Sequence, residues 1–212
     1  MKILAVSDTH NEHEKLKIGS GDILIHAGDA GVKGNFTEIK AFLDWFVKQN
    51  YKYKVFVPGN HDSKMYTHPD LIKLAEDYGI SVLHNDSVII EGVHIFGVSK
   101  TFPSEDRVEN FEEREKAWGC IPKKVDILVT HIPPKGILDL SDRGQNIGCS
   151  ELKKVVYEQA PLFHVFGHCH EYAGWQVHKP NLLVFNDTKF MNVAVKDRNY
   201  DLINYKGYEI RL

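Results

Sequence analysis

Short apolar runs bounded by turn residues recur along the chain, and their length and β-branched content are typical of buried strands. The runs at 23–26, 93–98 and 127–130 are clear examples, because each is rich in Ile, Leu, Val or Phe. We predict strands at Lys2–Val6, Ile23–His26, Lys54–Val57, Ser87–Ile90, Val93–Val98, Ile127–Thr130, Phe163–Phe166, Leu182–Phe185 and Phe190–Ala194.

Helical periodicity separates several of these runs. The clearest helix is predicted over Phe36–Lys48, where apolar residues share one face, Asn35 is placed as the N-cap and Glu38 is the third helical residue. Further helices are predicted over Asp70–Tyr78 and from Ser150 onwards.

The order of these elements predicts the fold class. Strands alternating with helices in the first half favour a parallel βαβ arrangement, and the closely spaced strands after Ser81 favour a second sheet with hairpins. We therefore predict an α/β protein with two stacked mixed β-sheets flanked by helices, as a single domain over residues 1–212. The stretch 132–149 is predicted to be a long loop, and the acidic segment 103–115 a solvated turn.

Charge, hydropathy and cysteine content narrow the possible functions. Lys plus Arg is 26 against 29 for Asp plus Glu, which gives a net charge of −3 and argues against binding of long nucleic acids. No apolar run approaches the roughly 18 residues that span a bilayer, so neither a signal peptide nor a membrane anchor is expected. The three cysteines, Cys120, Cys149 and Cys169, form no CxxC pair, which favours a reducing, cytoplasmic location.

Potential metal ligands follow five of the predicted strands. Because the carboxyl ends of strands in an α/β sheet line one crevice, we expect these side chains to meet there. Carboxylate, amide and imidazole groups together suit divalent cations. The clusters are Asp8-Thr9-His10, Gly28-Asp29, Gly59-Asn60-His61-Asp62, His131 and Gly167-His168-Cys169-His170.

In order and spacing, these clusters resemble the DxH, GD, GNHD, H and GHxH motifs of the calcineurin-like metallophosphoesterase superfamily. The resemblance spans residues 8–170 and implies a four-layer αββα sandwich with a binuclear metal site. It implies that Asp29 bridges the two metals. One metal would be held by Asp8, His10 and His170, and the other by Asn60, His131 and His168. Manganese, iron and zinc all suit this donor set, and the sequence does not rank them.

The same resemblance implies hydrolysis of a phosphoric ester. Two cations about 3.5 to 4 Å apart can share a bridging hydroxide as nucleophile and clamp the phosphate oxygens. The catalytic residues would be His61, Asn60 and Asp62. His61 would donate a hydrogen bond to the phosphate and protonate or stabilise the departing oxygen, and Asp62 would orient His61.

Further fragments resemble small metallophosphoesterase-domain proteins related to class III cyclic-nucleotide phosphodiesterases. They are Trp118-Gly119, Thr130-His131-Ile132-Pro133-Pro134, Gly148-Cys149-Ser150-Glu151-Leu152 and His164-Val165-Phe166-Gly167. This implies a phosphodiesterase that acts on a small phosphorylated substrate, with a cyclic nucleotide as one candidate.

The chain departs from its relatives at one motif. Protein serine/threonine phosphatases continue as GDxxDRG, whereas Gly28-Asp29 here continues as Ala30-Gly31-Val32-Lys33-Gly34. The carboxylate that usually partners the GNHD histidine is therefore not expected, nor is protein phosphatase activity.

Other functions and other residues stay open. A phosphomonoesterase or nuclease could use the same site, and a non-catalytic scaffold could share the fold. His26 and His164 lie in apolar runs and are expected to be structural or to support a ligand. Cys169 is expected in the core. Arg143 and Asn146 could reach a phosphate but are better explained by a solvated loop, and surface or loop positions are expected for His13, His68, His84, His94 and His178.

Overall fold

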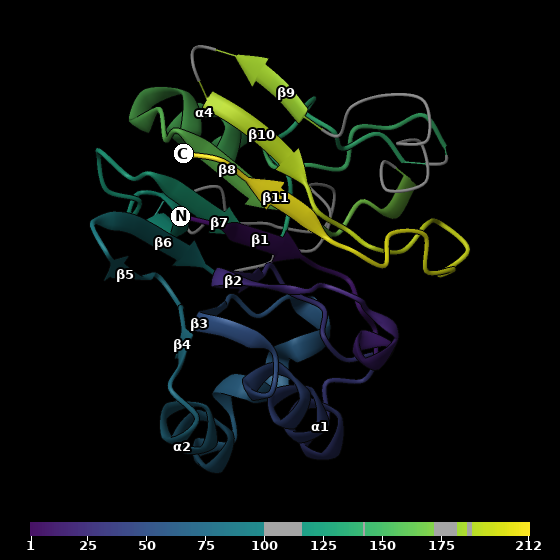
Figure 1. Cartoon of the computed structure of the whole chain (residues 1–212). Helices are drawn as coiled ribbons and strands as arrows, with labels where there is room; N and C mark the ends of the chain where they lie inside the picture. The colour runs from purple at the N-terminus through teal and green to yellow at the C-terminus, as the bar shows by residue number, and fades with distance from the viewer. Residues whose placement is uncertain (100–115, 142, 172–181, 186–187) are drawn as a thin grey trace.

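The structure is a computed structural model that describes residues 1–99, 116–141, 143–171, 182–185 and 188–212 (Figure 1). The whole acidic segment 103–115, together with His178, lies outside these residues, and so does the rest of the stretch 172–181.

The first sheet has the strand order β11-β1-β2-β3-β4. Strands β1 to β4 run parallel to their neighbours, and β11 pairs antiparallel with β1 at the edge. The strands are β1 (Ile3–Val6), β2 (Ser20–His26), β3 (Asn50–Phe56), β4 (Ile80–Val82) and β11 (Tyr208–Ile210).

The second sheet has the order β5-β6-β7-β8-β10-β9. Its central strands β6, β7, β8 and β10 are parallel, and β5 and β9 close the two edges as antiparallel hairpin partners. The strands are β5 (Asp86–Ile90), β6 (Val93–Val98), β7 (Ile127–Thr130), β8 (Phe163–Phe166), β9 (Leu182–Phe185) and β10 (Thr188–Asn192).

The two sheets stack face to face, and helices cover their outer faces. Side chains alternate between the two faces along β2. Ile23 and Ile25 pack between the sheets, and Leu24 packs outward with α1 (Phe36–Val47) and α2 (Pro69–Asp77). On the other side, Leu128 packs with α4 (Ser150–Gln159). The predicted arrangement of two mixed sheets flanked by helices is therefore confirmed.

All the predicted strands are present, and the differences occur at short or polar segments. Strands β2 and β3 begin earlier than predicted because Ser20 pairs with Asn50, which extends the ladder beyond the apolar runs. Strands β4 and β11 were not predicted, since each is only three residues long. Two short 3-10 helices, η1 (His13–Lys15) and η2 (Asn60–Tyr66), were also not predicted.

The expectation for His13 is wrong. Its side chain is buried, and its ring lies 5.7 Å from Phe42 and 5.1 Å from Trp45, centroid to centroid. The reason is that η1 contacts the apolar side of α1. Of the described helices, none is long and apolar enough to cross a membrane.

Candidate active site

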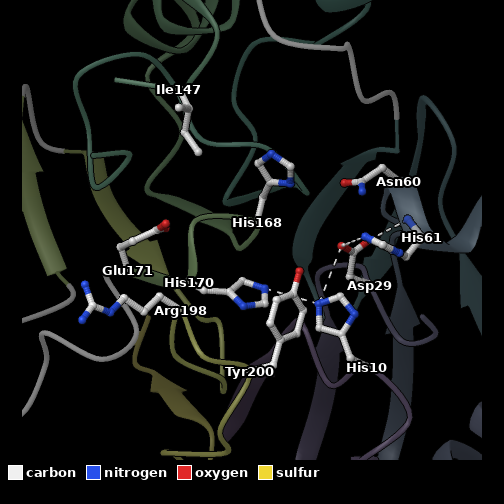
Figure 2. Close-up of a pocket in the computed structure, with 10 residues that line it drawn as sticks. All are labelled: His10, Asp29, Asn60, His61, Ile147, His168, His170, Glu171, Arg198 and Tyr200. Atoms are coloured by element: carbon white, nitrogen blue, oxygen red, sulfur yellow. Dashed lines mark hydrogen bonds and ion pairs between the residues drawn. The ribbon is translucent and has the colours of Figure 1, made fainter. Parts of the chain in front are cut away.

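The carboxyl ends of strands from both sheets bring five of the seven predicted ligands to the lining of one pocket (Figure 2), while the other two, Asp8 and His131, are fully buried and are not among its lining residues. Segments after β1, β2, β3 and β8 contribute His10, Asp29, Asn60 and His168 to its wall. Among the described residues, the lining comprises His10, Asp29, Asn60, His61, Ile147, His168, His170, Glu171, Arg198 and Tyr200.

Asp8, His10 and His170 form the first group of possible metal ligands, with one donor atom from each within 4.8 Å of the others. The Nε2 atom of His170 lies 3.1 Å from Asp8 Oδ1 and 3.3 Å from His10 Nε2. All three side chains are buried, so the donors converge where solvent is largely excluded.

Asp29, His131 and His168 form the second group. His131 Nε2 lies 3.2 Å from Asp29 Oδ2, and the same carboxylate oxygen lies 4.0 Å from His10 Nε2 of the first group. Asp29 therefore stands between the two groups.

The backbone at these positions adopts the left-handed region that L-residues rarely enter. The φ angles are 58° at Asp8, 42° at His10, 57° at Asp29 and 67° at His168. Each such residue costs on the order of 1–3 kcal/mol, so the surrounding structure has to hold it. The amide of Asp8 donates to the Gly28 carbonyl at 2.9 Å, and that of His10 donates to the Asp29 carbonyl at 3.1 Å.

Backbone carbonyls fix the tautomers of three ligand histidines. The Nδ1–H groups of His10 and His131 donate to Gly31 O and Ala27 O, both at 2.9 Å. That of His170 donates to Asp197 O at 3.2 Å. Because a carbonyl only accepts, each Nδ1 carries the proton and each Nε2 is left to face the carboxylates as a potential ligand.

The two carboxylates control the charge of this cluster. Burial by itself would raise the pKa of Asp8, but the hydrogen bond and charge of His170 hold that pKa far below its usual value. Burial by itself would lower the pKa of His131, but the Asp29 carboxylate raises it to about 10. Burial, assisted by the charge of His131, lowers the pKa of His168 to about 4. The cluster therefore attracts positive charge.

The residues present suit divalent metal ions. His131 Nε2 is fully buried, and within the described part of the chain it has no hydrogen-bond partner, although Asp29 Oδ2 is only 3.2 Å away. A cation bound to both atoms would satisfy that nitrogen, whose proton would be released on binding. Nitrogen and oxygen donors of this kind are those of transition-metal and zinc sites.

The three residues of the predicted catalytic motif have different surroundings. His61 is partly exposed at the pocket, with its Nε2 3.9 Å from Asp29 Oδ2, and Asn60 lies beside it in the wall. Asp62 is fully buried. Its carboxylate accepts from the amides of Ala30 at 3.2 Å, Gly31 at 3.1 Å and Gly59 at 2.9 Å. Burial and the charge of Asp29 raise the pKa of Asp62 to about 6.

The Asp62 carboxylate therefore holds backbone on both sides of the site, so any orienting effect on His61 would act through the chain and stays a prediction. The ring of His61 instead donates from Nδ1 to the carbonyl of Val32. No sequence motif predicts this contact, because the acceptor is the backbone carbonyl of Val32, a residue without a polar side chain.

Two more histidines support the ligand-bearing segments. His26 Nε2 lies 3.1 Å from Thr9 Oγ1, and His164 Nε2 lies 2.9 Å from Thr130 Oγ1. Burial lowers the pKa of each histidine to about 3, so both are neutral. Because the two threonines directly precede His10 and His131, these contacts have the structural, supporting character expected from the sequence.

The remaining expectations concern residues away from the ligands. Cys169 is buried, as expected. Asn146 donates to Asp139 Oδ1 at 2.7 Å, and neither it nor Arg143 belongs to the pocket lining among the described residues. Both residues are exposed, as a solvated loop requires.

Sequence reasoning missed four lining residues, which are Ile147, Glu171, Arg198 and Tyr200. Tyr200 has a φ of 65° and places its ring 4.8 Å from that of His170 and 5.1 Å from that of His10, centroid to centroid. The Asp197 carboxylate holds this turn by accepting from Asn199 N and Asp201 N. The only signal in the sequence is the polar, turn-forming character of 197–201.

Known proteins resemble the chain in sequence and in fold. It is 33% identical over 212 residues to "UPF0046 protein K07C11.7" of Caenorhabditis elegans, covering 92% of this chain and 69% of that protein. It is 30% identical to human "Metallophosphoesterase domain-containing protein 1", covering 96% of this chain and 68% of that protein.

Among solved structures, the phosphopantetheinyl hydrolase PptH of Mycobacterium tuberculosis matches with a TM-score of 0.60 at 15% identity. That match covers 94% of this chain and 90% of the other, and it shows a common fold. Residues 1–172 match the Calcineurin-like phosphoesterase family. With the converging carboxylates and histidines described above, this match places the chain in the calcineurin-like phosphoesterase family.

Proposed function

We propose that this protein is a two-metal phosphodiesterase. The observation that carries the proposal is the position of Asp29, whose Oδ2 atom lies within 3.2 Å of a donor in one ligand group and 4.0 Å of a donor in the other. A carboxylate between two sets of imidazoles suits a bridging ligand, and two-metal sites are a common solution for hydrolysis of phosphoric esters.

Each residue of the cluster has a role in this proposal. Asp8, His10 and His170 would hold one divalent cation, and Asn60, His131 and His168 the other, with Asp29 shared. When bound, such cations supply an activated water and positive charge against the phosphate. Because Nδ1–H of His61 is donated to the Val32 carbonyl, His61 would act as the imidazolium, and its Nε2–H, at the pocket, would donate a hydrogen bond to the phosphate and a proton to the departing oxygen.

The charge and surface of the pocket support a diester over a monoester. A phosphate diester carries one negative charge and a monoester up to two, and of the lining residues that the structure describes, only Arg198 is a permanent cation. Tyr200 and Ile147 add apolar surface suited to an organic substituent on the second ester oxygen. The substrate proposed is therefore a small phosphodiester, with a cyclic nucleotide as one candidate.

The test compares bis-p-nitrophenyl phosphate with p-nitrophenyl phosphate, using chelator-stripped protein reloaded with manganese. We expect metal-dependent hydrolysis with a higher kcat/KM for the diester. A preference for the monoester would replace the proposal with a phosphomonoesterase. Absence of hydrolysis of either compound in metal-loaded protein, followed by a failed screen of cyclic nucleotides, would favour a scaffold.

A further inference from the structure

The short segment 31–34, between β2 and α1, is tied to one carboxylate. Glu38 Oε2 accepts hydrogen bonds from three successive amides, those of Val32 at 3.1 Å, Lys33 at 2.8 Å and Gly34 at 2.9 Å. Glu38 is the third residue of α1, and its own amide donates to the N-cap side chain of Asn35 at 3.0 Å. In a capping box its carboxylate would return to the N-cap amide, whereas here it reaches further back along the chain.

The carbonyls of the same peptide units point at the active site. Gly31 O accepts from His10 Nδ1 at 2.9 Å, and Val32 O accepts from His61 Nδ1. In a planar trans peptide the C=O and N–H groups point in opposite directions, and the described chain contains no cis peptide bond. The Gly31–Val32 and Val32–Lys33 peptides therefore each have Glu38 on one side and a histidine ring on the other.

This geometry links a carboxylate to two active-site histidines through single peptide units. An anion that accepts from a peptide N–H polarises that peptide and makes its carbonyl a stronger acceptor. A stronger acceptor holds the proton on Nδ1 of the histidine and leaves Nε2 for the metal or the substrate. Among the described residues, the acceptor for Nδ1 of His61 is the Val32 carbonyl, so the Val32–Lys33 peptide is the route by which a carboxylate acts on this ring.

We propose that Glu38 is a positioning residue that fixes the ring orientation of His10 and His61 and keeps a proton on Nδ1 of each ring through these two peptides. The kinetic predictions rest on the proposed function, whereas the predicted protonation of the two rings does not. The segment 31–34 packs closely against the backbone of His61. A side chain at Gly34, where φ is 59°, would collide with the His61 carbonyl.

A simpler role for Glu38 would be to stabilise the start of α1, where a carboxylate is favoured by the helix dipole. Asn35→Ala separates the two roles, because it removes the N-cap acceptor and leaves the three amide contacts of Glu38 available. Asp44→Ala is a second control, since it removes another carboxylate of α1 that contacts Lys40 and Tyr78 instead of the segment 31–34.

The first test needs no activity. Nitrogen-15 NMR of metal-free protein reports which ring nitrogen of each histidine carries a proton. We expect His10 and His61 to be Nδ1-protonated in the wild type, in Asn35→Ala and in Asp44→Ala. In Glu38→Ala we expect the His61 signal to move toward a mixture of tautomers, with Glu38→Gln in between because an amide oxygen still accepts. Unchanged tautomers in Glu38→Ala would overturn the proposal.

The second test is kinetic and uses saturating manganese. Bis-p-nitrophenyl phosphate has a good leaving group, and diphenyl phosphate has a poorer one that depends more on proton donation by His61. We expect Glu38→Ala to lower kcat about 10-fold for diphenyl phosphate and less for the nitrophenyl ester, and to weaken manganese binding about 10-fold through His10. The double variant Glu38→Ala/His61→Ala should be no slower than His61→Ala.

The outcomes separate this inference from the proposed function. Wild-type protein that hydrolyses no phosphodiester would contradict the function, while the NMR result would still decide the role of Glu38. Additive losses in the double variant, or equal losses in Asn35→Ala, would reduce Glu38 to a helix-stabilising residue. If circular dichroism shows that Glu38→Ala does not fold, Glu38→Gln serves in both tests and must show the same direction of change.

Discussion

The floor and the rim of the pocket are built in different ways. The floor comprises the buried groups around Asp8 and Asp29, in which His10, His131 and His170 are each oriented by a backbone carbonyl. The rim comprises Ile147, Glu171, Arg198 and Tyr200, and it is more open, with Tyr200 53% exposed. A floor fixed in this way suits the reaction step, which needs donors held in place. An open rim suits the selection of substrates.

Electrostatics also distinguish the floor from buried histidines elsewhere in the fold. Histidines of the floor share a space with two buried carboxylates, so one of them, His131, has its pKa raised to about 10 although burial opposes this. Buried histidines without a carboxylate next to them, such as His164, have pKa values lowered by burial. Carboxylate placement, more than burial, is what makes the floor a cation site. Changes in the floor should therefore affect metal binding and kcat, whereas changes in the rim should affect KM.

The largest effect is expected for Asp29→Asn, which keeps the shape of the side chain and removes the charge between the two ligand groups. Both metals should bind more weakly, and diester hydrolysis should fall on the order of 10²–10³-fold. Calorimetric titration with manganese, beside a hydrolysis assay, measures both quantities. Two full equivalents bound with wild-type affinity would exclude a bridging role for Asp29.

The next largest effect is expected for His61→Ala. This side chain reaches the pocket but belongs to neither ligand group, so metal content should stay at the wild-type level while kcat falls about 10²-fold. Metal analysis of the purified variant together with steady-state kinetics checks both parts. Unchanged turnover would remove His61 from the mechanism.

The floor could be predicted from the sequence, and the rim could not. Asp8, His10 and His131 follow the apolar strands β1 and β7 within four residues, and the carboxyl ends of strands in α/β sheets line a crevice. Tyr200 and Ile147 come from irregular segments, and the path of such a segment depends on tertiary contacts, as the hydrogen bond from His170 Nδ1 to the Asp197 carbonyl shows for the turn before Tyr200. The groups that position His61 are not predictable from the sequence for a similar reason. Val32 contacts the ring through its backbone carbonyl, and the place of Glu38 near the start of a helix predicts only a capping role.

A moderate effect is expected at the rim. Tyr200→Ala should raise KM for bis-p-nitrophenyl phosphate roughly 10-fold, which corresponds to about 1.4 kcal/mol, and change kcat less than about 2-fold. Tyr200→Phe keeps the ring and is the matched control, expected to behave like the wild type. A collapse of kcat in Tyr200→Phe would instead place the phenol hydroxyl among the catalytic groups and break the distinction between floor and rim.

The last prediction concerns stability, with no expected effect on activity, and a buried histidine outside both regions. Burial lowers the pKa of His13 from its ordinary 6.5 to about 4, so the unfolded chain takes up a proton there before the folded chain does. The resulting stability is present above pH 6.5 and is lost as the pH falls from about 6.5 to about 4, by up to about 3 kcal/mol.

The substitution His13→Phe keeps an aromatic ring beside Phe42 and Trp45 and removes the titrating group. Urea unfolding at pH 7 and at pH 4.5 should then show a smaller loss of stability in the variant than in the wild type. An identical pH dependence of the two proteins would show that His13 is not kept neutral by burial.

A manganese titration of chelator-stripped protein, with calorimetry and hydrolysis of bis-p-nitrophenyl phosphate followed on the same samples, tests most directly whether the floor is a two-metal catalytic centre. We expect two equivalents to bind, hydrolysis to be absent before metal is added, and activity to reach its plateau only when the second equivalent is bound. Full activity at one equivalent, or hydrolysis that persists in the presence of chelator, would contradict the two-metal centre.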